Sequence, residues 1–281
     1  MSPNRNHEGY KDPTEMSWNL LGNTEETKTR EYFIANCSHG KDSQAMVRGL
    51  IQKGYPLDEV VFYDTGAEFK AIYDARDHLL PLLKEKGIKY TELHPTRSFF
   101  YDMLDKPVYS KKNGHHCGYG WCGGRTRWGT AAKRDALEKY INRIRARGFN
   151  VTQYIGIAAD EAPRIARNSG KGKRLPLVEW GWTEHYCLEL CYAEGVTWEE
   201  NGIRLYDILD RVSCWCCANK NLKELRNIRR ELPEYWERMK DLQDKIDKPF
   251  RAGRTSKNGR ITPARSIYDL DEQFAKEEKM V

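Results

Sequence analysis

The sequence predicts an α/β fold, in which a parallel sheet is flanked by helices and followed by a helical, basic C-terminal extension. The first observation behind this prediction is that short apolar runs alternate with stretches of helical periodicity. The second is that polar, glycine-containing turns follow the apolar runs, as in sheets with right-handed crossovers. The 281 residues are 39% hydrophobic and 31% charged, which is enough apolar material to bury a core.

Apolar runs over 32–35, 60–63 and 88–93 predict the first three strands. A helix is expected over 69–86, because its Ile72, Leu79, Leu80 and Leu83 share one face. Later elements follow the same logic, with a helix over 130–147, a strand over 154–158, a helix over 183–193 and two charged helices on either side of Pro233. In such a sheet, ligands bind at the carboxyl ends of the strands.

Three parts are expected along the chain: a polar N-terminal arm over 1–28, a main domain over 29–218, and a charged helical extension with a flexible tail over 219–281. No apolar run reaches the length of a membrane span, and the first residues contain no hydrophobic stretch of a secretory signal. We therefore expect a cytoplasmic protein without membrane contact.

The positive charge is concentrated late in the chain. Between residues 218 and 265 there are 14 Lys and Arg against 7 Asp and Glu, although the whole chain carries only +6. Such a surplus is typical of nucleic-acid binding, and equally of a solvated helical face. A nucleic-acid partner for this extension is one of the two interpretations.

The hexad Ser-His-Gly-Lys-Asp-Ser, from Ser38 to Ser43, lies between the first expected strand and its helix. Backbone N–H groups and the positive end of a helix converge there, which suits a phosphate. Gly40 permits close approach of an anion, and Lys41 adds a cation. The hexad is not a Walker loop, because Asp42 follows the Gly-Lys pair where that loop has Ser or Thr. A plain capped helix start is the alternative reading.

This hexad resembles the PP-loop of the adenine nucleotide alpha hydrolase superfamily, which holds ATP during cleavage between the alpha and beta phosphates. The segments VFYDTGAEF over 61–69 and YIGIAADEAPR over 154–164 resemble two strand motifs of its phosphoadenosine phosphosulfate (PAPS) reductase-like family. The likeness runs over about residues 32–225, with the motifs in the order of the family.

The resemblance implies an adenine nucleotide, ATP with magnesium or PAPS, in a pocket built from these motifs. The phosphates would be cradled by Ser38, His39, Gly40, Lys41, Asp42 and Ser43. The same pocket would be bordered by Asp64, Gly66 and Glu68, with Asp160 holding magnesium and acting with Lys41 in catalysis. Because guanidinium and ammonium groups suit oxyanions, the candidate phosphate clamps are Arg125, Arg127, Lys133 and Arg164.

The eight cysteines are too unevenly placed for a disulfide framework and favour a metal site, although reduced, buried thiols are the alternative. Related adenosine phosphosulfate reductases carry a four-iron cluster on a Cys-Cys pair and a later C-x-x-C pair. Cys122, Cys214 and Cys217 match that layout, but Trp121 stands where the family has the neighbouring cysteine. Cys191 is our choice of fourth ligand for a four-iron iron-sulfur cluster or, alternatively, zinc.

The favoured function is adenylylation of a substrate by ATP, with sulfur transfer as a possible second step. The first alternative is a sulfonucleotide reductase that releases sulfite. It ranks lower because those enzymes use a cysteine near the C-terminus and the last thiol here is Cys217, which leaves Cys216 as a poorly supported substitute. The second alternative is a nucleotide-sensing or nucleic-acid-binding module without turnover.

Overall fold

The computed structural model describes residues 30–111, 114–123, 126–168, 170, 172–256 and 258–279. A five-stranded parallel sheet, in the order β3-β2-β1-β6-β7, forms its centre. The strands are β1 (Arg30–Asn36), β2 (Glu59–Tyr63), β3 (Lys89–Leu93), β6 (Phe149–Ile155) and β7 (Lys173–Arg174). The predicted α/β fold with a parallel sheet is therefore confirmed. The N-terminal arm expected over 1–28 lies outside the described residues.

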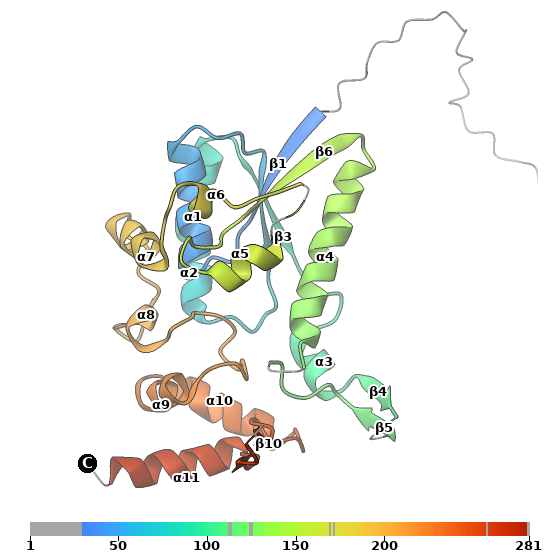
Figure 1. Cartoon of the computed structure of the whole chain (residues 1–281), viewed down its shortest axis with the longest axis vertical. Coiled ribbons are helices and arrows are strands. Elements are labelled where there is room, and N and C mark those ends of the chain that lie inside the picture. Colours follow the sequence, from blue (N-terminus) through green and yellow to red (C-terminus); the bar gives the residue numbers. More distant parts are fainter. Residues whose placement is uncertain are drawn as a thin grey trace, which may run out of the picture.

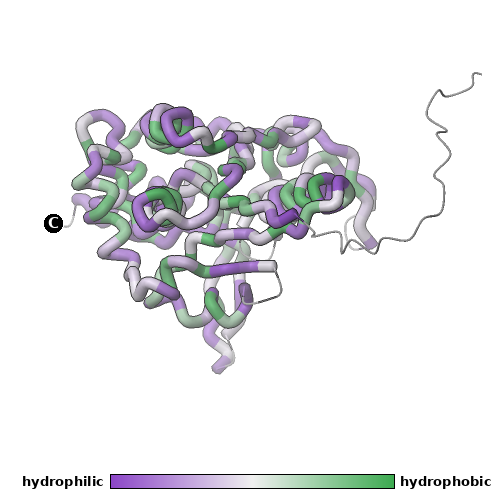
Figure 2. Tube along the Cα trace, turned by 90° about the horizontal axis from the view of Figure 1, so that it is seen from above, coloured by the Kyte–Doolittle hydropathy of each residue, from purple (hydrophilic) through white to green (hydrophobic). Residues whose placement is uncertain are grey.

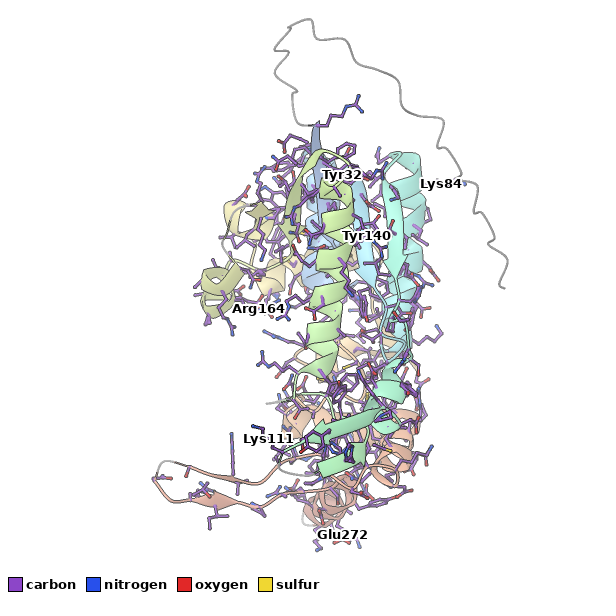
Figure 3. All side chains as sticks on the ribbon, turned by 90° about the vertical axis from the view of Figure 1, so that its right-hand side faces the viewer. Tyr32, Lys84, Lys111, Tyr140, Arg164 and Glu272 are labelled. Carbon is purple, nitrogen blue, oxygen red and sulfur yellow. The ribbon has the colours of Figure 1, made fainter. Side chains whose placement is uncertain are left out.

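Helices cover both faces of the sheet (Figure 1), and the alternation of side chains along the strands decides which face each residue joins. Ala35 and Phe62 belong to one buried cluster with residues of α1 (Lys41–Gln52) and α2 (Lys70–Glu85). Their chain neighbours Ile34 and Val61 form a second cluster with residues of α4 (Trp128–Arg145) on the other face. In Figure 3, Tyr32 of β1 and Tyr140 of α4 lie close together, and both hydroxyls donate to the buried Glu59.

The carboxyl edge of the sheet faces the C-terminal helices α9 (Leu222–Glu231), α10 (Pro233–Gln243) and α11 (Ile267–Glu278) (Figure 1). Trp236 of α10 and Phe274 of α11 are fully buried in the same hydrophobic cluster as the residues under α1 and α2. Along one side, α7 (Glu184–Ala193) packs on α1. The loops that follow the strands therefore emerge between the sheet and these helices.

The remaining elements are short. Between β3 and α4 lie α3 (Phe99–Leu104) and the hairpin of β4 (Pro107–Ser110) and β5 (Gly114–Cys117). Between β6 and α9 lie α5 (Ala162–Asn168), α6 (Pro176–Glu179), β8 (Glu199–Glu200), β9 (Ile203–Arg204) and α8 (Leu205–Ile208). The segment expected as a flexible tail holds the hairpin of β10 (Arg254–Thr255) and β11 (Ile261–Thr262), which extends from the body in Figure 3.

Helix α11 neutralises much of the basic surplus of the extension. Asp271 accepts from Arg229 at 2.7 Å and pairs with Lys240 at 3.2 Å, and Glu277 pairs with Arg226 at 2.5 Å. The charge surplus counted up to residue 265 omitted the acidic residues of this helix. Over the whole of 219–281 there are 16 Lys and Arg against 12 Asp and Glu, so the surplus is +4.

Hydrophilic and hydrophobic residues are interspersed along the helices, as Figure 2 shows by hydropathy. This pattern is typical of helices with one buried face. Of the helices described, none combines the length and the apolar character needed to cross a bilayer.

Close packing at Gly49 of α1 gives the first prediction. A Cβ added there would lie 2.5 Å from the ring of Trp180 and 2.8 Å from that of Trp182. Gly49→Val should therefore lower the free energy of unfolding by about 1–3 kcal/mol through overpacking. Urea denaturation measures this effect, with Gly170→Val as the control, because an added Cβ at Gly170 meets no described atom within 4 Å. Equal destabilisation by the two substitutions would show that packing at Gly49 is not the cause.

Candidate functional site

A cavity of about 720 Å³ lies at the carboxyl edge of the sheet. Its lining includes Ser38, Gly40, Lys41, Asp42 and Ser43 of the loop that precedes and begins α1. The same lining includes Cys122, Cys214 and Cys217. The two groups of residues that the sequence marked separately, one for phosphate and one for metal, thus border a common space.

The loop is held in shape by its own serines. The Ser43 hydroxyl donates to the Gly40 carbonyl at 2.9 Å and accepts from the Ser38 backbone N–H at 3.1 Å. The Lys41 N–H donates to the Tyr206 hydroxyl at 2.9 Å. Gly40 occupies the N-cap position and offers no side-chain acceptor to the first turn of α1, so this turn faces the cavity without a side-chain cap. Such a helix start favours an anion.

Three carboxylates from separate elements meet beside the loop: Asp42 of α1, Glu161 after β6 and Glu184 of α7. One oxygen from each lies within 4.8 Å of the others, a donor set that suits Mg²⁺. Asp160, the residue expected to hold magnesium, instead accepts from the Glu184 backbone N–H at 3.0 Å and so fixes the start of α7. Its neighbour Glu161 belongs to this group of three carboxylates, and Asp160 does not.

Each of these carboxylates is paired with a cation. The Lys41 ammonium contacts Asp42 at 3.0 Å and Glu184 at 2.9 Å. Burial works against the charged lysine, but the two carboxylates outweigh it and raise the pKa of Lys41.

Glu161 accepts from Arg164 at 2.6 Å and from Arg211 at 2.8 Å. Burial alone would raise the pKa of Glu161, but the hydrogen bond and charge of Arg164 outweigh this effect and lower it. Arg164, one of the expected clamps, lines the cavity. Arg211 also lines it, although no sequence motif contains this residue.

His39 lies behind the loop. Its Nε2 is 3.0 Å from the Tyr90 hydroxyl, its Nδ1 is 3.1 Å from Gln44, and its ring meets Phe62 edge to face at 4.7 Å. Its carbonyl accepts from Trp198 at 2.8 Å, and its φ of 58° turns the backbone into the loop. Burial, with a smaller effect of nearby cations, lowers the pKa of His39 to about 3. The side chain therefore supports the loop from the core and does not reach the cavity.

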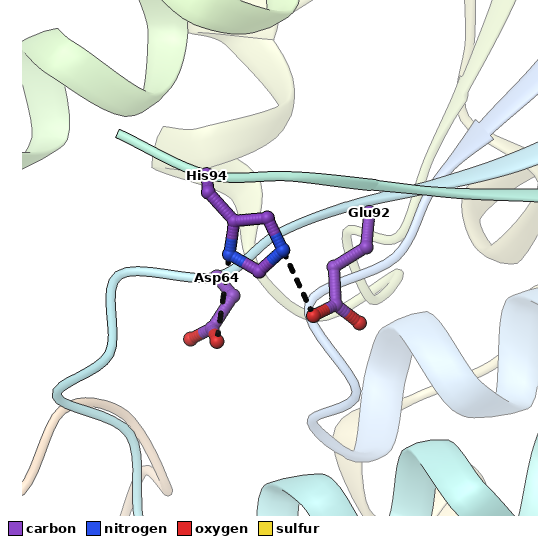
Figure 4. A group of neighbouring side chains, drawn as sticks. All are labelled: Asp64, Glu92 and His94. Atoms are coloured by element: carbon purple, nitrogen blue, oxygen red, sulfur yellow. Dashed lines mark ion pairs between the residues drawn. The ribbon is translucent and has the colours of Figure 1, made fainter. Parts of the chain in front are cut away.

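Asp64 and Gly66 shape the turn after β2. The Asp64 carboxylate accepts from the Gly66 N–H at 2.8 Å and from the Tyr73 hydroxyl at 2.8 Å. Its other neighbour is His94, whose ring lies between Asp64, at 3.9 Å, and Glu92, at 3.3 Å (Figure 4). Within the described chain, the cavity lining includes neither Asp64 nor Gly66, which were expected to border it.

Glu68 does line the cavity, as expected, and accepts from the Thr65 hydroxyl at 3.0 Å. Burial raises the pKa of Glu68, and the charge of Lys133 on α4 opposes the shift. Lys133 also lines the cavity. Of the other two expected clamps, Arg127 is exposed at the start of α4 and is not part of the lining, and Arg125 lies outside the described residues.

Cys122, Cys214 and Cys217 are brought together by contact between two distant loops. The Ala218 N–H donates to the Cys122 carbonyl at 3.0 Å, which ties the first loop to the C-x-x-C turn. At Gly123, φ is +148° and an added Cβ would lie 2.9 Å from the backbone beyond Ala218, so only glycine permits this approach. A hydrogen bond between the Cys214 and Cys217 thiols, together with burial, raises the pKa of Cys217.

The structure does not bring Cys191 to this group. Cys191 lies on the face of α7 that packs against α1, and its thiol donates to the Lys41 carbonyl at 3.5 Å. Cys187, one turn earlier, is buried on the same face, and burial raises the pKa of its thiol to about 12. Trp121, which stands where the family has a cysteine, turns away and donates from Nε1 to the Lys248 carbonyl at 3.2 Å. Three thiols therefore border the described part of the cavity.

Several residues of the cavity carry no sequence motif. Asp210, Arg211, Lys220 and Asn221 lie in the segment between α8 and α9, and Glu224 lies in the first turn of α9. This segment approaches the loop only in the folded chain, so local sequence patterns could not mark it.

No family model matches the chain. It is 27% identical over 255 residues to an uncharacterised protein of Methanocaldococcus jannaschii, a match that covers 85% of this chain and 47% of that protein. The chain thus spans about half the length of this relative. Among solved structures it is similar to the U34-tRNA thiolase NcsA from Methanococcus maripaludis with its [4Fe-4S] cluster, at 15% identity and a TM-score of 0.40. That match covers 92% of this chain and 76% of the other, and because both similarities are distant, function is inferred from the residues of the cavity.

The burial of His39 predicts a specific loss of stability in acid. The folded protein keeps His39 neutral down to about pH 3, whereas the unfolded chain takes up this proton near pH 6.5. Below pH 6.5 the unfolded state therefore binds the additional proton, and stability falls as pH decreases. The free energy of unfolding should fall between pH 7 and pH 5 by about 1–2 kcal/mol more in the wild type than in His39→Gln.

Unfolding titrations at the two pH values make this comparison, and His115→Gln, at an exposed position, serves as the control. The control should lose as much stability as the wild type. An identical pH dependence in His39→Gln and the wild type would contradict the assignment of His39 to the neutral core.

Proposed function

We propose that this protein is a PP-loop enzyme that cleaves ATP between the alpha and beta phosphates, adenylylates a substrate oxygen and then transfers sulfur to the activated carbon. The observation that carries the proposal is the shared cavity, in which the anion-binding loop and three cysteines border one space. A nucleotide held by the loop would place its reacting end beside the thiols. Neither part alone would suggest both steps.

The ion pairs beside the loop are suited to exchange partners when MgATP binds. Lys41, Arg164 and Arg211 are held at the cavity by carboxylates, and phosphate oxygens would take over these cations. The released carboxylates of Asp42, Glu161 and Glu184 fit magnesium, which when bound would neutralise the charge of the departing pyrophosphate.

The three cysteines fit a metal centre with one open coordination position. A four-iron cluster or a zinc ion offers four such positions, and Cys122, Cys214 and Cys217 supply three ligands from the cavity lining. The iron-sulfur cluster is our first choice and zinc the second. When bound, the centre would present a hydrosulfide ion as the sulfur nucleophile.

The second step then balances without any redox change. The sulfur of the hydrosulfide forms a bond to the activated carbon, the carbon–oxygen bond breaks, and AMP leaves with the oxygen. The proton of the hydrosulfide is released. Lys133 and Arg164, both in the lining, would bind the departing nucleotide phosphate.

A nucleic-acid base is the acceptor that we favour. The cavity lining includes Asn219, Lys220, Asn221 and Glu224 of the C-terminal extension, whose net charge is +4. Arg254 and Arg260 of the projecting hairpin region are exposed and add positive charge beyond the body. Such a surface would attract phosphates of a polynucleotide whose base reaches the cavity.

A sulfonucleotide reductase is less well supported by the geometry. That reaction needs a mobile thiolate that reaches the nucleotide and is later released by a reductant. Cys216, the substitute nucleophile, is fully buried and does not belong to the described lining of the cavity.

The nucleotide part of the proposal is tested by removing the loop cation. Lys41→Ala should weaken ATP binding by about 1.5–3 kcal/mol, because a charge-assisted contact to a phosphate oxygen is lost. Calorimetric titration with a non-hydrolysable α,β-analogue and with PAPS gives the affinities. Lys53→Ala, at the exposed end of α1, is the control and should bind as the wild type does. Unchanged affinity in Lys41→Ala would refute the loop as the phosphate site.

The metal part is tested cysteine by cysteine. After anaerobic preparation, Cys122→Ser, Cys214→Ser and Cys217→Ser should each lose most of the bound iron or zinc. Cys191→Ser should keep the metal, because its thiol lies under α1 and outside the cavity lining. Metal and sulfide analysis of the four variants decides the point. Loss of metal from Cys191→Ser would contradict this expectation and would favour Cys191 as the fourth ligand, as expected from the sequence.

A further inference from the structure

Lys220 is a buried lysine whose ammonium forms no hydrogen bond and no ion pair with any described residue. Its side chain belongs to a residue that is 3% exposed, and its Nζ has no hydrogen-bond partner among the described residues. The ammonium lies 5.0 Å from the centre of the Phe69 ring, a cation–π contact that offsets part of the cost of burial. Burying an ammonium without a hydrogen-bonded counter-ion is unfavourable, so the position of Lys220 requires an explanation.

Lys220 lies close in the chain to Cys214 and Cys217, and it borders the same space as the three cysteines of the cavity. Lys220 lines the cavity, and its backbone N–H donates to the Cys217 carbonyl at 3.2 Å, so it follows the C-x-x-C turn directly. The charge of Lys220 acts on Cys217 and on Glu68. Glu68 itself is hydrogen-bonded to Thr65 and forms no described ion pair with Lys220. The described part of the chain thus supplies no direct partner for this ammonium.

We infer that Lys220 is the counter-cation of a negatively charged metal–thiolate centre held by Cys122, Cys214 and Cys217, an inference that rests on the metal part of the proposed function. Three thiolates around a zinc ion, or around the dipositive core of a four-iron cluster, leave a single net negative charge. Lys220 neutralises that charge in the buried part of the cavity. It is a positioning residue, since it acts through the centre and not on the substrate.

Two opposite effects follow from this role. In the metal-bound protein, Lys220 stabilises the centre and makes its reduction easier, because a positive charge favours the added electron. In the metal-free protein, the same ammonium is buried without a counter-ion and destabilises the fold. A lysine that only fills space would stabilise both forms.

The test compares Lys220→Met, which keeps the length of the side chain and removes its charge, with the wild type and with Lys223→Met. Lys223 is exposed on the same segment and serves as the matched control. The full chain is prepared anaerobically and loaded with iron and sulfide, or with zinc. Three quantities are measured: the chelator concentration that removes half of the metal, the reduction potential of the iron-loaded centre, and the unfolding of the metal-free protein in urea.

Lys220→Met should lose its metal at a 10- to 100-fold lower chelator concentration than the wild type, as expected when an outer-shell partner of a metal is removed. Its reduction potential should be more negative, and its metal-free form at least as stable as the metal-free wild type. Lys223→Met should match the wild type in all three measurements.

Equal metal retention and equal potential in Lys220→Met and the wild type would overturn this inference and leave the metal centre itself intact. Destabilisation of the metal-free variant, in parallel with its metal loss, would also overturn it, because the lysine would then act as packing. A wild type that binds no metal would overturn both the inference and the metal part of the proposed function, whereas ATP binding to the loop would remain a separate result.

Discussion

The parallel pairing of β1 with β6 is the constraint on which the candidate site depends. The two strands are in register from Arg30 opposite Phe149 to Asn36 opposite Ile155, so the loops that follow them leave the sheet side by side. From β1 the chain adds β2 and β3 on one side of the sheet and β6 on the other, so β1 and β6 flank the topological switch point. Ligands of open α/β sheets bind at such a point. Gly156 permits the contact, since a Cβ there would lie 3.0 Å from the backbone of Ser43. The anion-binding loop and Glu161 therefore meet without any local motif to join them.

The second half of the site depends on the C-terminal extension. The hydrogen bond from Ala218 to Cys122 and the glycine at 123 hold two loops together across almost a hundred residues of sequence. Trp121 contributes from the other side, because its indole packs on Phe250 at 4.9 Å and anchors the cysteine loop to the extension. The extension is thus part of the cavity as well as a charged surface. Its helices pack into the main hydrophobic cluster. The acidic side chains of α11 pair with its basic ones, so the extension is less basic than the charge count up to residue 265 indicates.

The sequence predicted the parts of the structure that are local. Strand and helix periodicity predicted the sheet, and the hexad predicted the loop between β1 and α1 that lines the cavity. The sequence could not predict which side chains reach the cavity, because this depends on the turn after β6 and on the face of α7. Asp160 and Glu161 are neighbours, but one fixes the start of α7 while the other reaches the carboxylate group. Cys191 shares with Cys187 the buried face of α7, which packs on α1, and it does not belong to the described lining of the cavity.

The central claim is that nucleotide and metal share one cavity, and the most direct test is the spectrum of the metal centre during nucleotide binding. Protein prepared anaerobically with its metal, or with cobalt in place of zinc, is titrated with the α,β-non-hydrolysable ATP analogue while its absorption is recorded. The account predicts a spectral change that saturates at the same analogue concentration as binding measured by calorimetry. Nucleotide binding of normal affinity with no change in the spectrum of the centre would contradict it.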